Sequence, residues 1–176
     1  MLGWGGDSSE CGDTCGRAED RGFVTAALSG VGPSGWGSWR SPGANDPRTC
    51  ASGTPEYCHR YESCDCASPN CHWTTCEDSV TQVLEVYEAI VAAYCIDLDR
   101  VWAMGCSNGG MMVHGLAYDD RTAPLLAGVA PMIGLPHNGH NRRPRSPMHY
   151  LGHWGISDTT VRKHRPLPIF LQHDFI

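Results

Sequence analysis

The sequence predicts an α/β fold in which a mostly parallel sheet carries helices on both faces. From residue 79 to residue 154, apolar runs of strand length alternate with segments of helical periodicity. This alternation is typical of parallel strands, because the connection between them must cross over a face of the sheet. A chain of 176 residues has the length of one domain, so we expect residues 1–176 to form a single domain.

The clearest helix is expected to begin at Ser79, which forms a plausible capping box with Gln82, and to run to about Tyr94. Its apolar residues fall on one face at helical spacing. A shorter helix is expected from Met111 to Tyr118. Buried strands are predicted for the four apolar runs Gly22–Leu28, Val101–Met104, Ala127–Ile133 and His149–Trp154.

Composition and charge narrow the class of protein. With 41% hydrophobic and 18% charged residues, the chain is too apolar to be disordered. A net charge of −6 argues against nucleic acid as a partner, since phosphate contacts need a basic surface. No stretch approaches the roughly 20 apolar residues that span a bilayer, so we expect no membrane association.

Cysteines are unusually frequent, and six of the ten lie between Cys50 and Cys76. We expect them to form disulfides that staple an insertion at residues 29–77, which indicates a secreted protein, although no signal peptide is visible after Met1. The spacings between Cys58 and Cys76 lack the paired C-x2-C of structural zinc sites, so zinc is the alternative and no metal or cofactor is expected. Cys106 either forms a disulfide or fills a small buried space.

Residues 105–109 read Gly-Cys-Ser-Asn-Gly, which matches the G-x-S-x-G nucleophile elbow. In that motif a serine sits on a sharp turn from a strand into a helix, and the flanking glycines leave room for the neighbouring backbone. The pattern is weak alone. Here an apolar strand precedes it and a helical segment follows, so we predict that Ser107 is a catalytic nucleophile, with a structural Gly-rich turn as the alternative.

A serine nucleophile needs a histidine base, a carboxylate that orients the base, and two N–H groups that bind the oxyanion. We expect one N–H from Asn108 and the other from the Gly-rich N-terminal loop that contains Trp4. The carboxylate is expected from Asp158, which follows the last predicted strand; a turn-capping role is the alternative. Only His164 and His173 follow Asp158, and neither fits the base well.

Residues 94–112, Tyr-Cys-Ile-Asp-Leu-Asp-Arg-Val-Trp-Ala-Met-Gly-Cys-Ser-Asn-Gly-Gly-Met-Met, resemble the secreted esterase family that includes polyhydroxybutyrate depolymerases and fungal feruloyl esterases. Residues 2–6 are similar to the end of that family's oxyanion loop L-H-G-x-G-G, and residues 22–24 to its next strand. Residues 152–161 are similar to its segment around the triad Asp, here Asp158. The resemblance implies an α/β-hydrolase fold and a Ser-His-Asp esterase of feruloyl, acetyl or polyhydroxyalkanoate esters.

Three features depart from the family pattern. The His of L-H-G is absent, the strand before it is missing, and no histidine matches the family's catalytic one. We therefore expect an α/β-hydrolase core truncated at both ends, with the base supplied from outside these 176 residues. On this expectation the chain by itself has little esterase activity.

Two further classes remain open, a degenerate hydrolase that serves as a binding protein and a cysteine-rich structural or zinc domain. The histidines at 114, 137, 140, 149 and 153 form no ligand motif, and we expect loop or packing roles for them. Trp36 and Trp39 either form an aromatic wall of a substrate site or pack beneath the insertion.

Overall fold

A computed structural model of the chain describes residues 1, 3, 5–31, 37–40, 75–134 and 145–158. Its centre is a three-stranded sheet in the order β1-β2-β3, formed by β1 (Trp102–Cys106), β2 (Gly128–Met132) and β3 (His149–Tyr150). Both pairings are parallel, and a bridge between Met132 and His153 continues the second one. The predicted α/β class with a parallel sheet is confirmed.

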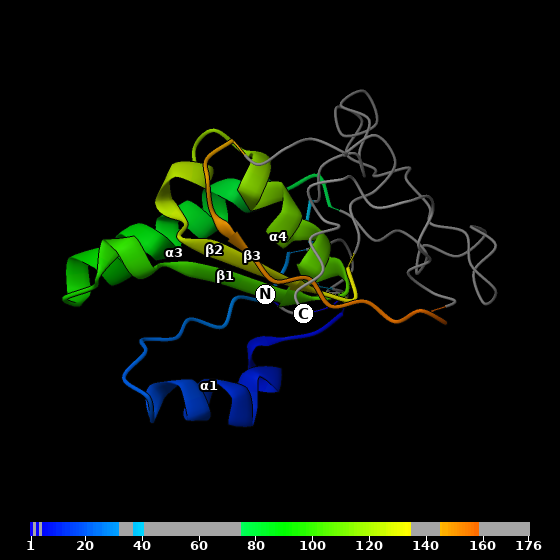
Figure 1. Ribbon diagram of the computed structural model, residues 1–176, viewed down its shortest axis with the longest axis horizontal. Helices are drawn as coiled ribbons and strands as arrows, with labels where there is room; N and C mark the ends of the chain where they lie inside the picture. The colour runs from blue at the N-terminus through cyan, green and yellow to red at the C-terminus, as the bar shows by residue number, and fades with distance from the viewer. Residues whose placement is uncertain (2, 4, 32–36, 41–74, 135–144, 159–176) are drawn as a thin grey trace.

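Three helices accompany the sheet: α1 (Gly12–Glu19), α3 (Ser79–Ala93) and α4 (Asn108–Tyr118). Short 3-10 helices span Ser8–Cys11, Leu98–Arg100 and Ala123–Leu125. Figure 1 shows α3 and α4 on one side of the sheet and α1 on the other. No helix in these described segments is long and apolar enough to span a membrane.

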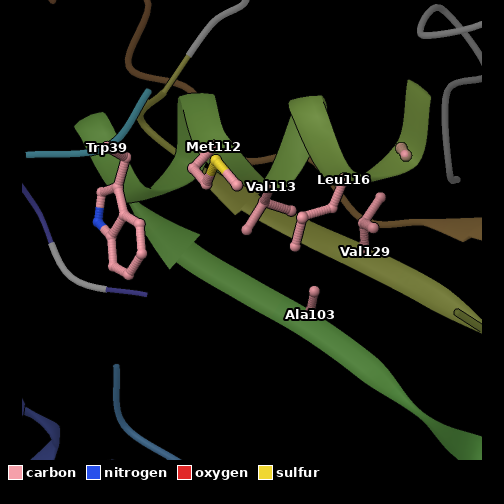
Figure 2. Close-up of a cluster of buried hydrophobic side chains, with 7 residues drawn as sticks. Trp39, Ala103, Met112, Val113, Leu116 and Val129 are labelled. Atoms are coloured by element: carbon pink, nitrogen blue, oxygen red, sulfur yellow. The ribbon is translucent and has the colours of Figure 1, made fainter. Parts of the chain in front are cut away.

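The core lies between α4 and the sheet, as Figure 2 shows. Ala103 and Gly105 of β1 are buried toward α4, whereas the alternate residues Trp102 and Met104 are 49% and 46% exposed on the opposite face. Trp39 is fully buried beside the start of α4, which confirms packing for this tryptophan; Trp36 lies outside the described residues. The buried cluster comprises Trp39, Ala103, Met112, Val113, Leu116, Ala117 and Val129.

Helix α3 confirms the predicted helix but corrects its N-terminal cap. The cap is Asp78, whose Oδ1 accepts hydrogen bonds from the backbone N–H groups of Val80 and Thr81, both at 3.2 Å. Ser79 is buried instead, and its Oγ accepts the backbone N–H of Arg40 at 2.9 Å. The predicted capping box at Ser79 is therefore wrong, because a carboxylate one residue earlier satisfies the first N–H groups.

Two expectations for the N-terminal part are also wrong. Residues 23–28 form no strand; Phe23 and Val24 are 55% and 50% exposed, and the N–H of Phe23 bonds back to the carbonyl of Ala18. An apolar run becomes a strand only where a ladder partner is available, and this run follows directly from a helix end. That helix, α1, was not predicted, because its residues show no apolar periodicity.

The prediction of disulfides holds for some of the described cysteines and not for others. A disulfide joins Cys11 to Cys15, and Cys76 is also disulfide-bonded. Cys95 and Cys106 have free thiols, so the disulfide expected as one alternative for Cys106 is wrong; this residue is half-buried. The other five cysteines, and most of the predicted insertion at 29–77, lie outside the described residues.

Candidate active site

Ser107 sits between the end of β1 and the start of α4, as the elbow motif predicts. Its backbone has φ 52° and ψ −120°, a conformation that a non-glycine residue adopts only under strain. Two hydrogen bonds hold the turn: the Ser107 N–H donates to the carbonyl of Met132 at 2.9 Å, and the Ser107 carbonyl accepts from Met111 N–H at 3.0 Å. Strain of this kind clusters at functional sites.

The glycines around Ser107 let α4 approach β1 closely. A Cβ on Gly105 would lie 2.5 Å from the carbonyl oxygen of Gly109, and one on Gly110 would lie 2.9 Å from that of Met132. These neighbours are backbone atoms, which cannot rotate away. Gly105 of the motif, and Gly110 just after it, are therefore required by the packing of strand against helix.

The N-terminal segment runs beside the elbow. The N-terminal amine of Met1 donates to Met104 O at 2.7 Å, and Cys106 N–H donates to Met1 O at 3.2 Å. A Cβ on Gly3 would lie 3.6 Å from the Cβ of Ser107. The Gly-rich loop thus lies next to Ser107, where an oxyanion loop is expected, although Trp4 itself lies outside the described residues.

The side chain of Asn108 has a role that sequence reasoning missed. Asn108 is fully buried, and its Oδ1 accepts the backbone N–H of Trp39 at 2.8 Å and the hydroxyl of Ser38 at 3.4 Å. Just before this segment, the carbonyl of Gly37 accepts the N–H of Gly5 at 2.7 Å. Asn108 therefore ties residues 37–39, and through them the N-terminal loop, to the elbow. No pattern around Asn108 signals this, because its partners, the backbone N–H of Trp39 and the hydroxyl of Ser38, are distant in sequence.

Asp158 follows β3 and the bridge at His153, at the carboxyl edge of the sheet where Ser107 follows β1. Because the strands are parallel, the two residues leave the sheet at the same edge, with β2 between them. Asp158 is half-buried, and its N–H donates to the carbonyl of Gly155 at 3.3 Å in a turn. This turn leaves open both the predicted triad role and the capping alternative.

Three histidines are described. His114 is fully buried in α4 and His149 stacks on Trp102 with ring centroids 5.7 Å apart, so the packing roles predicted for these two are confirmed. His153 contributes its backbone to the bridge beside β2. The remaining histidines, including His164 and His173, lie outside the described residues. In the described segments no three His, Cys, Asp or Glu side chains gather as a metal site would require.

Cys106 precedes Ser107 and is the other nucleophile at the turn. Burial raises the pKa of its thiol, and the carboxylate of Glu10 raises the pKa further, against a smaller opposite effect of the N-terminal amine. A thiol with a raised pKa stays protonated at neutral pH and is a poor nucleophile. The raised pKa therefore does not mark Cys106 as an activated nucleophile.

Comparisons of the chain with protein-family models, with curated proteins and with solved structures found no significant match in any of the three.

Proposed function

We propose that the protein belongs to the α/β-hydrolases and is a serine hydrolase of carboxylic esters. The observation that carries the proposal is the backbone of Ser107, at φ 52° and ψ −120° between the strand β1 and the buried helix α4. This turn raises the serine above the carboxyl edge of a parallel sheet, where a substrate carbonyl can reach it. A Gly-rich loop beside the serine supports the same assignment.

In the proposed reaction the Ser107 oxygen attacks the ester carbonyl while a histidine base removes the hydroxyl proton. The N–H of Asn108 and that of Trp4 stabilise the oxyanion, and the start of α4 adds the positive end of its dipole. The C–O bond to the alcohol then breaks, and the histidine returns the proton to the leaving alkoxide. Water activated by the same histidine releases the acid from the acyl-enzyme.

Asp158 is proposed to orient that histidine, because it follows β3 at the same edge of the sheet where Ser107 follows β1. Only β2 lies between these two strands. We propose that the base comes from outside these 176 residues. The substrates proposed from the family resemblance are feruloyl or acetyl esters of plant polysaccharide, or polyhydroxyalkanoates.

The test is Ser107-dependent chemistry in a natural chain that contains these residues together with the proposed external base, measured as labelling by a fluorophosphonate and as release of p-nitrophenol from p-nitrophenyl acetate. We expect the label on Ser107, and its loss in Ser107→Ala but not in the control Ser157→Ala, which removes an exposed hydroxyl from the turn before Asp158. Asp158→Asn is expected to lower the labelling rate by several orders of magnitude, as loss of a triad acid does.

Two outcomes separate the alternatives. Turnover by these 176 residues that disappears in His164→Gln or His173→Gln would place the base within the chain and overturn the proposed external base. Absence of a label on Ser107 in both the unmodified protein and Ser157→Ala would remove the nucleophile and favour the degenerate binding protein.

A further inference from the structure

His114 is a fully buried imidazole on α4, the helix that Ser107 begins. Its Nε2 lies 2.9 Å from the carbonyl oxygen of Gly134, and its Nδ1 lies 2.7 Å from the hydroxyl of Tyr150 on β3. The phenol oxygen is farther from Nε2, at 3.1 Å. Because a carbonyl can only accept, Nε2 carries the hydrogen and donates to Gly134, and Nδ1 accepts from Tyr150. Burial lowers the pKa of His114 to about 4, so the ring is neutral at pH 7.

Gly134, the residue that His114 holds, packs directly against the elbow. A Cβ at this position would overlap the carbonyl oxygen of Ser107 and lie 2.7 Å from the backbone nitrogen of Met111. Gly134 is thus in van der Waals contact with the first turn of α4. Any movement of Gly134 toward the helix pushes on the backbone of Ser107.

The two residues before Gly134 connect the elbow to β3. The Met132 carbonyl accepts the N–H of Ser107 at 2.9 Å, and the Ile133 N–H donates to the carbonyl of His153 at 2.7 Å. Residues 132–134 therefore touch both the nucleophile and the segment that leads to Asp158. They are a spacer between the two ends of the proposed triad.

The spacer is strained at Ile133, which has φ 44°. A β-branched side chain disfavours positive φ, so this conformation persists only where the surroundings hold it in place. On the side of α4, two described hydrogen bonds flank Ile133: that of the Ser107 N–H to the carbonyl of Met132, and that of His114 to the carbonyl of Gly134. Tyr150 in turn fixes the imidazole from β3.

We propose that His114 is a positioning residue that holds the turn at residues 132–134, and thereby sets the distance between Ser107 and Asp158. The catalytic consequence rests on the proposed function, whereas the geometric role does not. A merely structural histidine would stabilise the whole core equally. A positioning histidine controls the carboxyl end of β2 more strongly than its beginning.

The experiment compares His114→Leu, which removes both hydrogen bonds, with His114→Gln, whose amide can still donate to Gly134 O. The control is Val113→Ala, which loses packing at the neighbouring buried position without touching the turn. NMR amide exchange is compared at two positions: Ile133, directly after β2, and Ala127, directly before β2. The N–H of Ala127 donates to the carbonyl of Val101 at 2.8 Å. Ser107-dependent hydrolysis of p-nitrophenyl acetate is measured alongside, in a chain that includes the proposed external base.

In His114→Leu we expect exchange at Ile133 to accelerate at least about tenfold more than at Ala127, and kcat to fall at least about tenfold with little change in KM. His114→Gln should recover most of the exchange protection at Ile133 and most of kcat. Val113→Ala should accelerate exchange of the Ile133 and Ala127 amides by the same factor. Equal acceleration at Ile133 and Ala127 in His114→Leu, or no recovery in His114→Gln, would overturn the proposal.

Two measures keep this test decisive. If His114→Leu does not fold, Tyr150→Phe removes only the phenol hydroxyl and is expected to give the same selective acceleration at Ile133, to a smaller extent; its absence counts against the proposal. If a chain that includes the proposed external base shows no Ser107-dependent turnover, the proposed function fails, while the exchange comparison still decides whether His114 positions the turn.

Discussion

Helices α4 and α1 are built on opposite principles. Every residue of α4 is buried, and its first residue follows a serine whose side chain makes no capping hydrogen bond. No residue of α1 is buried, and a disulfide from Cys11 to Cys15 clamps its first turn. Before α1, the carboxylate of Asp7 caps the short helix that leads into it, accepting the N–H of Ser9 at 2.8 Å.

The comparison shows where the strained turn at Ser107 obtains its support. Helix propensity and capping contribute little to α4, which contains three glycines, so its position comes from contacts with β1 and β2. Helix α1 is held by local bonds that would persist without the sheet. A catalytic turn can be strained only where the surrounding packing fixes it, and α4 provides that packing.

The largest expected effect comes from truncating the buried face of α4. Leu116 is fully buried, so Leu116→Ala should reduce the free energy of unfolding by about 3–4 kcal/mol through lost burial and the cavity left behind. For a chain of this size that lowers Tm by roughly 10 °C. Arg17→Ala on α1 should change stability by less than about 0.5 kcal/mol. Equal shifts for both variants in thermal unfolding would break the comparison.

The second prediction concerns pH, because α4 buries a titratable group and α1 does not. Burial lowers the pKa of His114 to about 4, from about 6.5 in the unfolded chain. The unfolded state binds the proton more readily than the folded state. The contribution of the neutral His114 ring to the free energy of unfolding is therefore complete above pH 6.5 and is lost as pH falls toward 4. The loss amounts to about 3 kcal/mol, measurable by urea unfolding at both ends of this range.

The control is His114→Gln, which cannot titrate in this window. Its stability should therefore vary less between pH 6.5 and pH 4 than that of the unmodified protein. An identical pH dependence in both proteins would show that His114 is not the group responsible.

The same contrast explains which parts of the fold could be predicted. The strand before Ser107 and the helix after it are expected from apolar runs and from the glycines of the elbow, because burial against a sheet leaves such a pattern. Helix α1 leaves none, since Cys11 and Cys15 fix it by a pairing that sequence does not reveal. The apolar run at residues 22–28 is the converse case: its side chains are apolar, but no strand among the described residues pairs with it.

The candidate site divides in the same way. Ser107 and the edge at which Asp158 lies follow from motif and chain order. The supporting contacts do not, because the side chain of Asn108 and the imidazole of His114 bond to backbone groups of Trp39 and Gly134 that only the folded chain brings near. Any asparagine or histidine in a buried helix could have such partners, so residue type alone does not identify them.

The third prediction tests the local character of α1. Replacing both Cys11 and Cys15 by Ser removes a cross-link that closes a very short loop, worth about 2 kcal/mol by loop entropy. Because α1 buries no residue, we expect this loss to appear as fraying of α1 and not as global unfolding. Exchange of the Asp20 amide, which bonds to Gly16 O at 2.9 Å, should accelerate while urea unfolding of the core stays unchanged.

A fall in the core transition comparable to that of Leu116→Ala would show that α1 is coupled to the sheet. The single variant Cys15→Ser would leave a free thiol at Cys11, so the double variant is the cleaner measurement.

Helix α3 provides the smallest effect and an intermediate case, since it packs Val80 and Val83 against the core yet depends on a side-chain cap. Hydrogen bonds from Thr81 and Arg121 outweigh the opposing effect of burial and lower the pKa of Asp78 to about 2.

Asp78→Ala should reduce stability by about 1 kcal/mol at pH 7, and Asp78→Asn by less, because the amide oxygen still accepts the helix N–H groups. Thermal unfolding with Glu77→Gln as control checks this. If Asp78→Ala has no effect, core packing alone sets the start of α3, and α3 then behaves as α4 does.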